Sequence, residues 1–157
     1  MTDAPLPIPR IPASASAVIF DSRLRLLILK PNYKKGWTLP GGQLEADGES
    51  PWEACQRETS EETGLQIQNA GLACVDFLRP RPGRPGGLRF LFDCGVLPHE
   101  QLALITLQTD EIAAYQLVEV PRALELLSGP IRRRVSATLG RDRCIYLEDG
   151  RPVAKVP

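Results

Sequence analysis

The most sharply bounded segment of this sequence is a helix that we predict between Ser50 and Gly64. Ser50 is a favoured N-cap residue, Pro51 suits the first helical position, and Glu53 completes a capping box three residues after the cap. Gly64 supplies the left-handed residue at which many helices end. Because local chemistry fixes both ends of this helix, the chain before it and after it has to form separate elements.

Short apolar runs on either side of the helix predict strands. Ala15–Phe20 and Leu24–Leu29 are separated by three residues, which predicts a hairpin, and Cys74–Leu78 and Leu88–Val96 predict two strands joined by a proline-rich loop. The remaining segments predict a strand, two helices and a terminal hairpin at Tyr115–Val120, Arg122–Leu127, Ile131–Leu139 and Ile145–Ala154. The mixture favours an α/β sandwich around a mixed, largely antiparallel sheet.

The length of the chain indicates a single domain. The 157 residues, 43% of them hydrophobic, are enough for one core. The run PLPIPRIP near the N-terminus fixes φ at alternate positions and lacks backbone donors. We therefore expect residues 1–12 to be a proline-rich extended leader and residues 13–157 to be one domain.

The charge and cysteine content exclude several classes of partner. A formal net charge of zero argues against binding of the whole chain to nucleic acid or to an anionic membrane. No apolar run approaches the roughly 18 residues of a membrane-spanning helix. Four scattered cysteines and one histidine argue against a structural zinc site or a disulfide framework. We expect four buried, inert thiols in a protein of the reducing cytoplasm.

Three carboxylates share one face of the predicted helix. Glu58, Glu61 and Glu62 have the spacing i, i+3, i+4, so they repel one another unless a cation lies among them. Oxygen ligands suit Mg²⁺ or Mn²⁺ better than zinc. Arg57 adjoins Glu58 and follows Glu53 by four positions, so it can orient a carboxylate and offset the negative charge. The alternative is a solvated acidic face.

The residues around these carboxylates distinguish the two interpretations. The run GGQLEADGESPWEACQRETSEETGL, from Gly41 to Leu65, resembles the Nudix box, G-x5-E-x7-R-E-U-x-E-E-x-G-U with U aliphatic, and is preceded by GWTLP. Two positions depart from that pattern. Six residues rather than five separate Gly42 from Glu49, and Thr59 occupies an aliphatic position. The Thr59 hydroxyl would be buried against the sheet, which is tolerable if it bonds a carbonyl one turn back.

The resemblance implies a Nudix-type α/β/α sandwich that uses Mg²⁺ or Mn²⁺ to hydrolyse a diphosphate bond in a nucleoside diphosphate linked to a group X. By motif position, Arg57 would orient Glu58, while Gly41 and Gly42 would shape the loop along which the phosphates approach. The implied metal-binding residues are Glu49, Glu58, Glu61 and Glu62. A bound ion of this kind screens the phosphoryl charge and activates water.

Two carboxylates are candidates for the general base. In similar proteins the base is either a glutamate of the box or a carboxylate from a later loop. Glu58 is the candidate in the box, and Glu111, which precedes a predicted strand, is the candidate in a loop. The alternative for Glu111 is an ordinary exposed loop residue.

Residues outside the box should determine the substrate, a small nucleotide. Arg79 and Arg81, with Arg84 and Arg89, could grip a distal phosphate or a sugar, or could be ordinary surface charges. Pro80 follows Leu65 by 15 residues, a spacing that accompanies ADP-ribose as substrate in similar proteins. We therefore prefer ADP-ribose or another nucleotide sugar to a nucleoside triphosphate.

Three further expectations concern catalysis, assembly and RNA binding. A non-catalytic module that senses a nucleotide on the same fold is the alternative to an enzyme. The family often pairs, which leaves a homodimer open. The run Arg132–Arg134 is expected to form a solvated helix face rather than a site for RNA.

Overall fold

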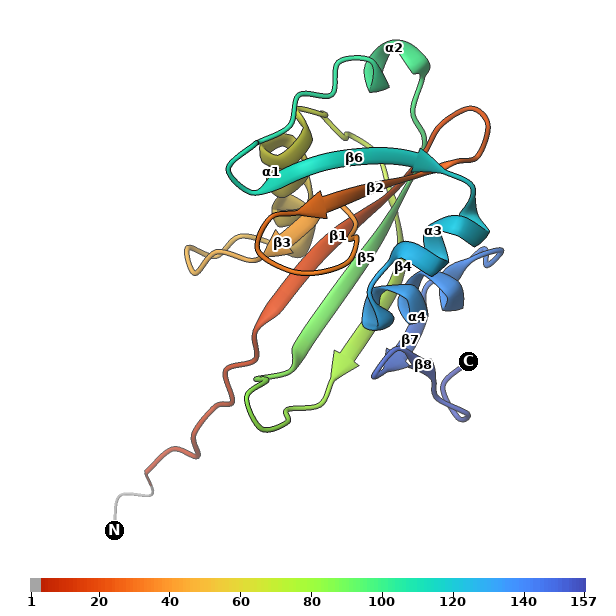
Figure 1. The fold of residues 1–157 in the computed structure, drawn as a ribbon. Helices are drawn as coiled ribbons and strands as arrows, with labels where there is room; N and C mark the ends of the chain where they lie inside the picture. The colour runs from red at the N-terminus through yellow and green to blue at the C-terminus, as the bar shows by residue number, and fades with distance from the viewer. Residues whose placement is uncertain (1–3) are drawn as a thin grey trace.

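A computed structural model describes residues 4–157 of the chain, and an open mixed sheet organises them (Figure 1). The strands are β1 (Ala13–Phe20), β2 (Leu26–Pro31), β3 (Gly41–Gln43), β4 (Gly71–Leu78), β5 (Gly87–Val96), β6 (Ile112–Val118), β7 (Ile145–Glu148) and β8 (Arg151–Pro152). The helices are α1 (Pro51–Thr63), α2 (His99–Leu102), α3 (Val120–Leu126) and α4 (Gly129–Thr138).

The strand order across the sheet is β6-β2-β1-β5-β4-β7-β8, with β3 also paired to β1. The β1–β5 and β4–β7 pairs are parallel, and the other strand pairs are antiparallel. The sheet is therefore mixed and largely antiparallel, as the sequence predicts. The parallel pairs matter for the site because they place segments distant in sequence side by side.

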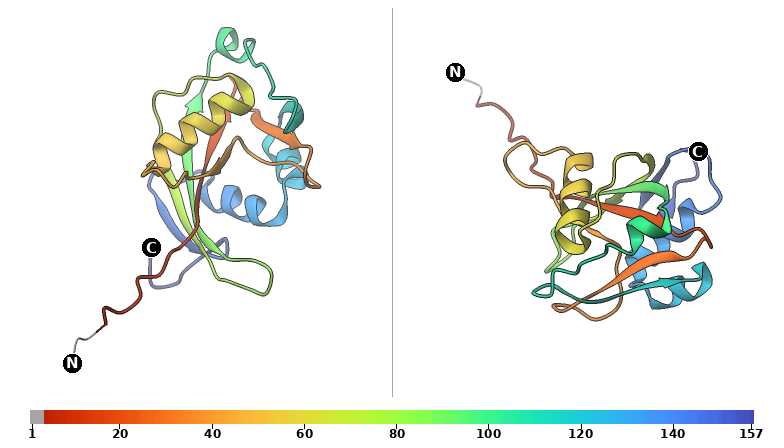
Figure 2. Two further views of the ribbon diagram at one scale, coloured as in Figure 1. Left: turned by 90° about the vertical axis from the view of Figure 1, so that its left-hand side faces the viewer. Right: turned by 90° about the horizontal axis from the view of Figure 1, so that it is seen from above.

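Helices cover both faces of this sheet, which confirms the predicted sandwich (Figure 2). Alternate residues of a strand face opposite sides. On β2, Leu27 and Leu29 therefore pack into the core beneath α1, whereas Leu26 and Ile28 pack into the core beneath α3 and α4. The strand is buried on both faces, so its sequence is apolar throughout rather than alternating.

Local chemistry fixes the ends of α1 as predicted. The Ser50 hydroxyl accepts a hydrogen bond from the Glu53 backbone N–H at 3.1 Å, and the Glu53 carboxylate accepts one from the Ser50 N–H at 2.8 Å. Gly64 ends the helix in the left-handed region at φ 75°. The terminal turn is also as expected, since Asp149 and Gly150 both have positive φ and join β7 to β8.

The first residues and one short helix complete the description. Residues 4–12 form neither helix nor strand, and they extend away from the sheet (Figure 1). Residues 1–3 of the predicted leader lie outside the described residues. Helix α2 was not predicted, because its four residues begin without a side-chain cap. Within residues 4–157 there is no helix long and apolar enough to span a membrane.

The prediction of four buried thiols is wrong, and the Thr59 hydroxyl is buried as predicted but does not bond a carbonyl one turn back. Cys144 is exposed, while the other three cysteines are buried. The Thr59 hydroxyl is buried without a hydrogen-bond partner in the described chain, because its motif position points into the core, where it meets the weakly bonding Cys55 thiol. The carbonyl of Thr59 instead accepts from the Thr63 hydroxyl at 2.6 Å.

Replacement of threonine by valine should have opposite effects on stability at positions 59 and 63. Thr59→Val removes an unsatisfied buried hydroxyl and should raise the free energy of unfolding by about 1 kcal/mol. Thr63→Val removes a hydroxyl that donates to Thr59 and accepts from the Leu65 N–H, and should lower it by about 1 kcal/mol. Urea unfolding measures both values. Equal destabilisation by the two variants would contradict this account.

Candidate functional site

A cavity of about 560 Å³ lies where α4 approaches the sheet. It is lined by residues of β1, β3, β5, α1 and α4, together with the loop that follows β2 and the end of the loop that precedes β6. Of the predicted site residues, the cavity brings together Gly41, Gly42, Glu58, Glu62 and Glu111. These residues come from three separate segments, so only the tertiary fold could unite them.

The two glycines of β3 allow the carboxylates of α1 to approach the sheet. The Gly41 N–H donates a hydrogen bond to Glu62 Oε2 at 2.9 Å. A Cβ atom on Gly42 would lie 2.4 Å from the Cδ of Glu58, so any side chain there would displace that carboxylate. Gly41 has φ 151°, and a Cβ on it would lie 2.3 Å from the Ala15 carbonyl oxygen. Both positions therefore require glycine for close approach.

Burial makes these carboxylates reluctant to ionise. Glu62 is only 2% exposed, and burial raises its pKa to about 8, with further increases from Glu58 and Glu111. The Gly41 N–H and the Lys34 ammonium oppose that rise. Burial likewise raises the pKa of Glu58, although Arg57 lowers it. The cavity thus holds nearby carboxylates whose negative charge is only partly compensated.

Arg57 connects the carboxylates of α1 to the loop before the helix. Its Nε and Nη2 donate to the two oxygens of Glu49 at 2.6 and 3.0 Å, and its Nη1 donates to Glu58 at 2.9 Å and to Glu61 at 3.2 Å. The Nη2 also donates to the Gln43 carbonyl at 3.1 Å. The hydrogen bonds from Arg57 keep the pKa of Glu49 below its usual value. Arg57 therefore contacts the Glu58 carboxylate directly, and its orienting role stays a prediction.

Glu49 and Glu61 lie on the Arg57 side of this cluster rather than in the cavity. Glu61 forms an ion pair with Arg57, and its side chain is 48% exposed. For that reason no three acidic, histidine or cysteine side chains within residues 4–157 converge closely enough to hold a metal ion in this conformation. Glu58 and Glu62 are the implied metal-binding residues that line the cavity.

Arg79 and Arg81 lie outside the residues that line the cavity. Arg79 pairs with Glu148, and Arg81 lies 3.6 Å from Asp149. Glu148 is the last residue of β7 and Asp149 follows it, and the parallel pairing of β7 with β4 carries both acids to the beginning of the proline-rich loop. The sequence could not reveal this pairing, because about 70 residues separate the partners.

Arg134 contradicts the expectation of a solvated arginine face on α4. It is 8% exposed, lines the cavity, and donates through Nε to Asp76 Oδ2 at 2.7 Å. Asp76 is fully buried and also accepts from the Gly150 N–H at 2.9 Å. A signal for this pair was present in the sequence: Asp76 shares the core-facing side of its strand with Cys74, where an acid needs a buried partner.

Comparisons with known proteins identify the family to which this chain belongs. A family model described as the NUDIX domain matches residues 10–139. The chain therefore belongs to the Nudix family, and the predicted family, fold and hydrolase class are confirmed. No sequence among curated proteins matches the chain.

Solved structures of bacterial, archaeal and animal proteins share the fold. A mutator MutT protein from Bacillus halodurans is 25% identical with a TM-score of 0.67, and the match covers 87% of both chains. A MutT protein from Methanosarcina mazei Go1 is 26% identical with a TM-score of 0.63, covering 81% of this chain and 91% of that one. A C. elegans Ap4A hydrolase is 23% identical with a TM-score of 0.60, covering 82% and 98%.

The raised pKa of Glu62 predicts how the stability of the metal-free protein depends on pH. The folded chain keeps a proton on Glu62 that the unfolded chain releases near pH 4.5, so the resulting stability is complete below that pH and is lost as the pH rises to about 8. In urea unfolding with EDTA, the free energy of unfolding should fall less steeply between these two pH values for Glu62→Gln than for the parent protein. Glu125→Gln, at an exposed helix position, is the control. Parallel curves for Glu62→Gln and the parent would disprove the assignment.

Proposed function

We propose that this protein hydrolyses a diphosphate bond in a small nucleoside diphosphate linked to a group X. The observation that carries the proposal is the close approach of the partly buried Glu58 and the buried Glu62 to Gly42 and Gly41 at the edge of the cavity. Phosphoryl transfer depends on positioning and on neutralising the charge of the phosphate oxygens. A cavity with buried carboxylates and nearby cations suits a substrate whose phosphates are bound with divalent metal.

The residues present fit a divalent cation, Mg²⁺ or Mn²⁺. Glu58 and Glu62 offer hard oxygen ligands, and a cation between them would relieve the repulsion that raises their pKa values. Glu61 would join them by leaving Arg57, and Glu49 would support the arrangement through Arg57. A bound ion of this kind supplies charge neutralisation and an activated water.

Glu58 and Glu111 are the two candidates for the general base, and both line the cavity. Two observations support Glu111. Glu58 is already engaged by Arg57, whereas the loop that carries Glu111 is anchored by a hydrogen bond of 2.7 Å from the Asn32 N–H to the Glu111 carbonyl oxygen. Within residues 4–157 the Glu111 carboxylate itself makes no hydrogen bond or ion pair, so it is available to a water molecule. Loss of turnover in Glu111→Gln, with nucleotide affinity retained, is expected of the base.

ADP-ribose or another nucleotide sugar is the first candidate substrate, because the Pro80 spacing favours it, and a nucleoside triphosphate is the second. The pairing of Arg79 and Arg81 with acids weakens the support from that loop. The matched solved structures include an Ap4A hydrolase, a UDP-X diphosphatase and a dihydroneopterin triphosphate pyrophosphohydrolase, so the panel should be broad. The free thiols of all four cysteines support the cytoplasm as the compartment.

The test of the proposed function is phosphate release from a panel of such compounds. With Mg²⁺ or Mn²⁺ and a coupled phosphatase, the parent protein should turn over at least one of them, and Glu62→Gln should be about 100-fold slower or worse while remaining folded. Glu125→Gln should retain the parent rate. Binding without release from any compound would favour the nucleotide-sensing alternative, and full turnover by Glu62→Gln would reject its role.

Gly42→Ala tests the close approach of Glu58 to β3. The new Cβ would meet the mobile end of the Glu58 side chain, so the melting temperature should change little while the carboxylate is displaced. Turnover and Mn²⁺ affinity should each fall by about tenfold or more. Gly48→Ala is a control for a glycine with open space around it. Unchanged Mn²⁺ affinity in Gly42→Ala would contradict the inferred role of Gly42.

A further inference from the structure

Arg134 presents unused donors to the cavity. Its side chain is nine-tenths buried, and among the described residues its only side-chain hydrogen bond runs from Nε to Asp76. Arg134 nevertheless lines the cavity, and its Nη1 and Nη2 atoms make no hydrogen bond within residues 4–157. Asp76 is held in turn by the Gly150 N–H, which leaves Arg134 little freedom to move.

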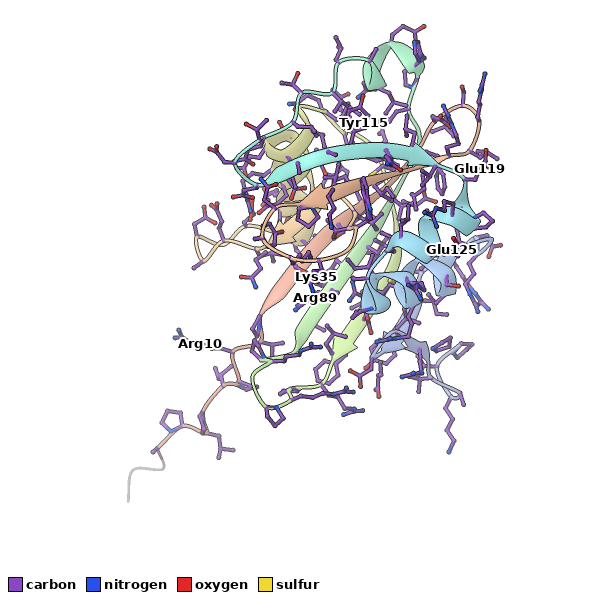
Figure 3. The ribbon with its side chains drawn as sticks, in the orientation of Figure 1. Arg10, Lys35, Arg89, Tyr115, Glu119 and Glu125 are labelled. Carbon is purple, nitrogen blue, oxygen red and sulfur yellow. The ribbon has the colours of Figure 1, made fainter. Side chains whose placement is uncertain are left out.

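Arg89, which lies on β5 within the sheet, also lines this cavity (Figure 3). On β5 it pairs in register with Asp76 of β4 and with Ser14 of β1. Its Nη1 donates to the Leu88 carbonyl at 3.1 Å, and it makes no ion pair within residues 4–157. Burial lowers the pKa of Arg89, the charge of Arg134 lowers it further, and the charge of Asp76 opposes both effects.

The charge of Arg89 is not needed to neutralise Asp76. One cation is sufficient for that, and Arg134 provides it. Arg89 adds a second cation to this part of the cavity lining, whereas Lys34, which also lines the cavity, interacts with Glu62. If Arg134 served only to neutralise Asp76, a half-buried Arg89 beside it would be an uncompensated cost. An anion in the cavity would remove that cost.

We propose that Arg134 and Arg89 form an anion subsite for a phosphoryl group of the substrate other than the two of the cleaved diphosphate. This inference rests on the proposed function in taking the ligand to be the substrate. Guanidinium groups bind phosphoryl oxygens in bidentate fashion, and the fixed Arg134 loses little entropy on binding. The hydroxyl side chains of Ser14 and Ser16 also line the cavity and add donors.

The subsite narrows the substrate class to compounds with a third phosphoryl group. The carboxylates come from α1, Arg134 comes from α4 and Arg89 from β5, so the subsite occupies a different wall from the carboxylates. A nucleoside triphosphate, or a nucleotide sugar with a phosphate on a ribose, could satisfy both. ADP-ribose has only the two phosphoryl groups of its diphosphate and none for the arginine subsite. The subsite therefore makes ADP-ribose a poorer expected substrate than compounds with a third phosphoryl group.

The first experiment measures binding without turnover. Inorganic triphosphate is titrated calorimetrically into the full chain in EDTA, where the metal plays no part. Arg89→Gln should weaken binding about tenfold or more, and Arg122→Gln, at an exposed position of α3, should bind as the parent does. Citrate is the carboxylate control and should bind more weakly than triphosphate. Equal binding by Arg89→Gln and the parent, or no binding by the parent, would overturn the subsite.

Arg134 needs a paired substitution, because Arg134→Ala would leave Asp76 buried without its cation and could unfold the chain. The double variant Asp76→Asn with Arg134→Gln replaces the ion pair by neutral polar groups. It should also weaken triphosphate binding about tenfold or more, with urea unfolding confirming that it is folded. Parent-like affinity in the folded double variant would contradict the role of Arg134.

The second experiment uses turnover to identify the source of the phosphoryl group. Two ratios are measured: kcat/KM for ATP divided by kcat/KM for ADP-ribose, and kcat/KM for ADP-ribose 2′-phosphate divided by kcat/KM for ADP-ribose. Both ratios should exceed one in the parent protein. Whichever ratio falls about tenfold in Arg89→Gln identifies the source, whereas unchanged ratios would overturn the substrate class. If nothing is hydrolysed, the proposed function fails while the binding measurement still decides on the subsite.

Discussion

Mutual repulsion among the carboxylates of α1 is the constraint around which the site is arranged. Three glutamates on one helical face destabilise an isolated helix, and here two of them are also pressed against the sheet. Arg57 compensates from one side by binding Glu49, Glu58 and Glu61 together. It cannot serve Glu62, whose burial leaves its pKa at about 8. The remaining repulsion is what a divalent cation would relieve.

The close contact between α1 and β3 depends on the absence of side chains. Gly42 leaves the space that Glu58 occupies, and Gly41 offers its N–H to Glu62. The cavity is lined both by residues of α1, which packs on one face of the sheet, and by residues of α4, which packs on the other. Acidic and basic groups can thereby meet across one cavity, although their elements belong to different layers.

Much of the fold could be predicted because its signals are local. The capping box at Ser50, the Asp149-Gly150 turn and the apolar runs of the strands each specify an element within a few residues. Predictions about individual buried groups were less successful. The Thr59 hydroxyl has no partner in the described chain and Cys144 is exposed, because both depend on which atoms a distant segment brings near.

The sequence by itself determined the family, the sandwich and the acidic helix, since the motif lies in one continuous segment whose helical spacing places its carboxylates on one face. Only the tertiary structure decided which arginines face the cavity. Arg79 and Arg81, two positions apart in the loop, pair with acids that the parallel β4–β7 contact brings near, whereas Arg134 and Arg89 come from α4 and β5. Charge pairing over such separations is set by strand order, which no local pattern encodes.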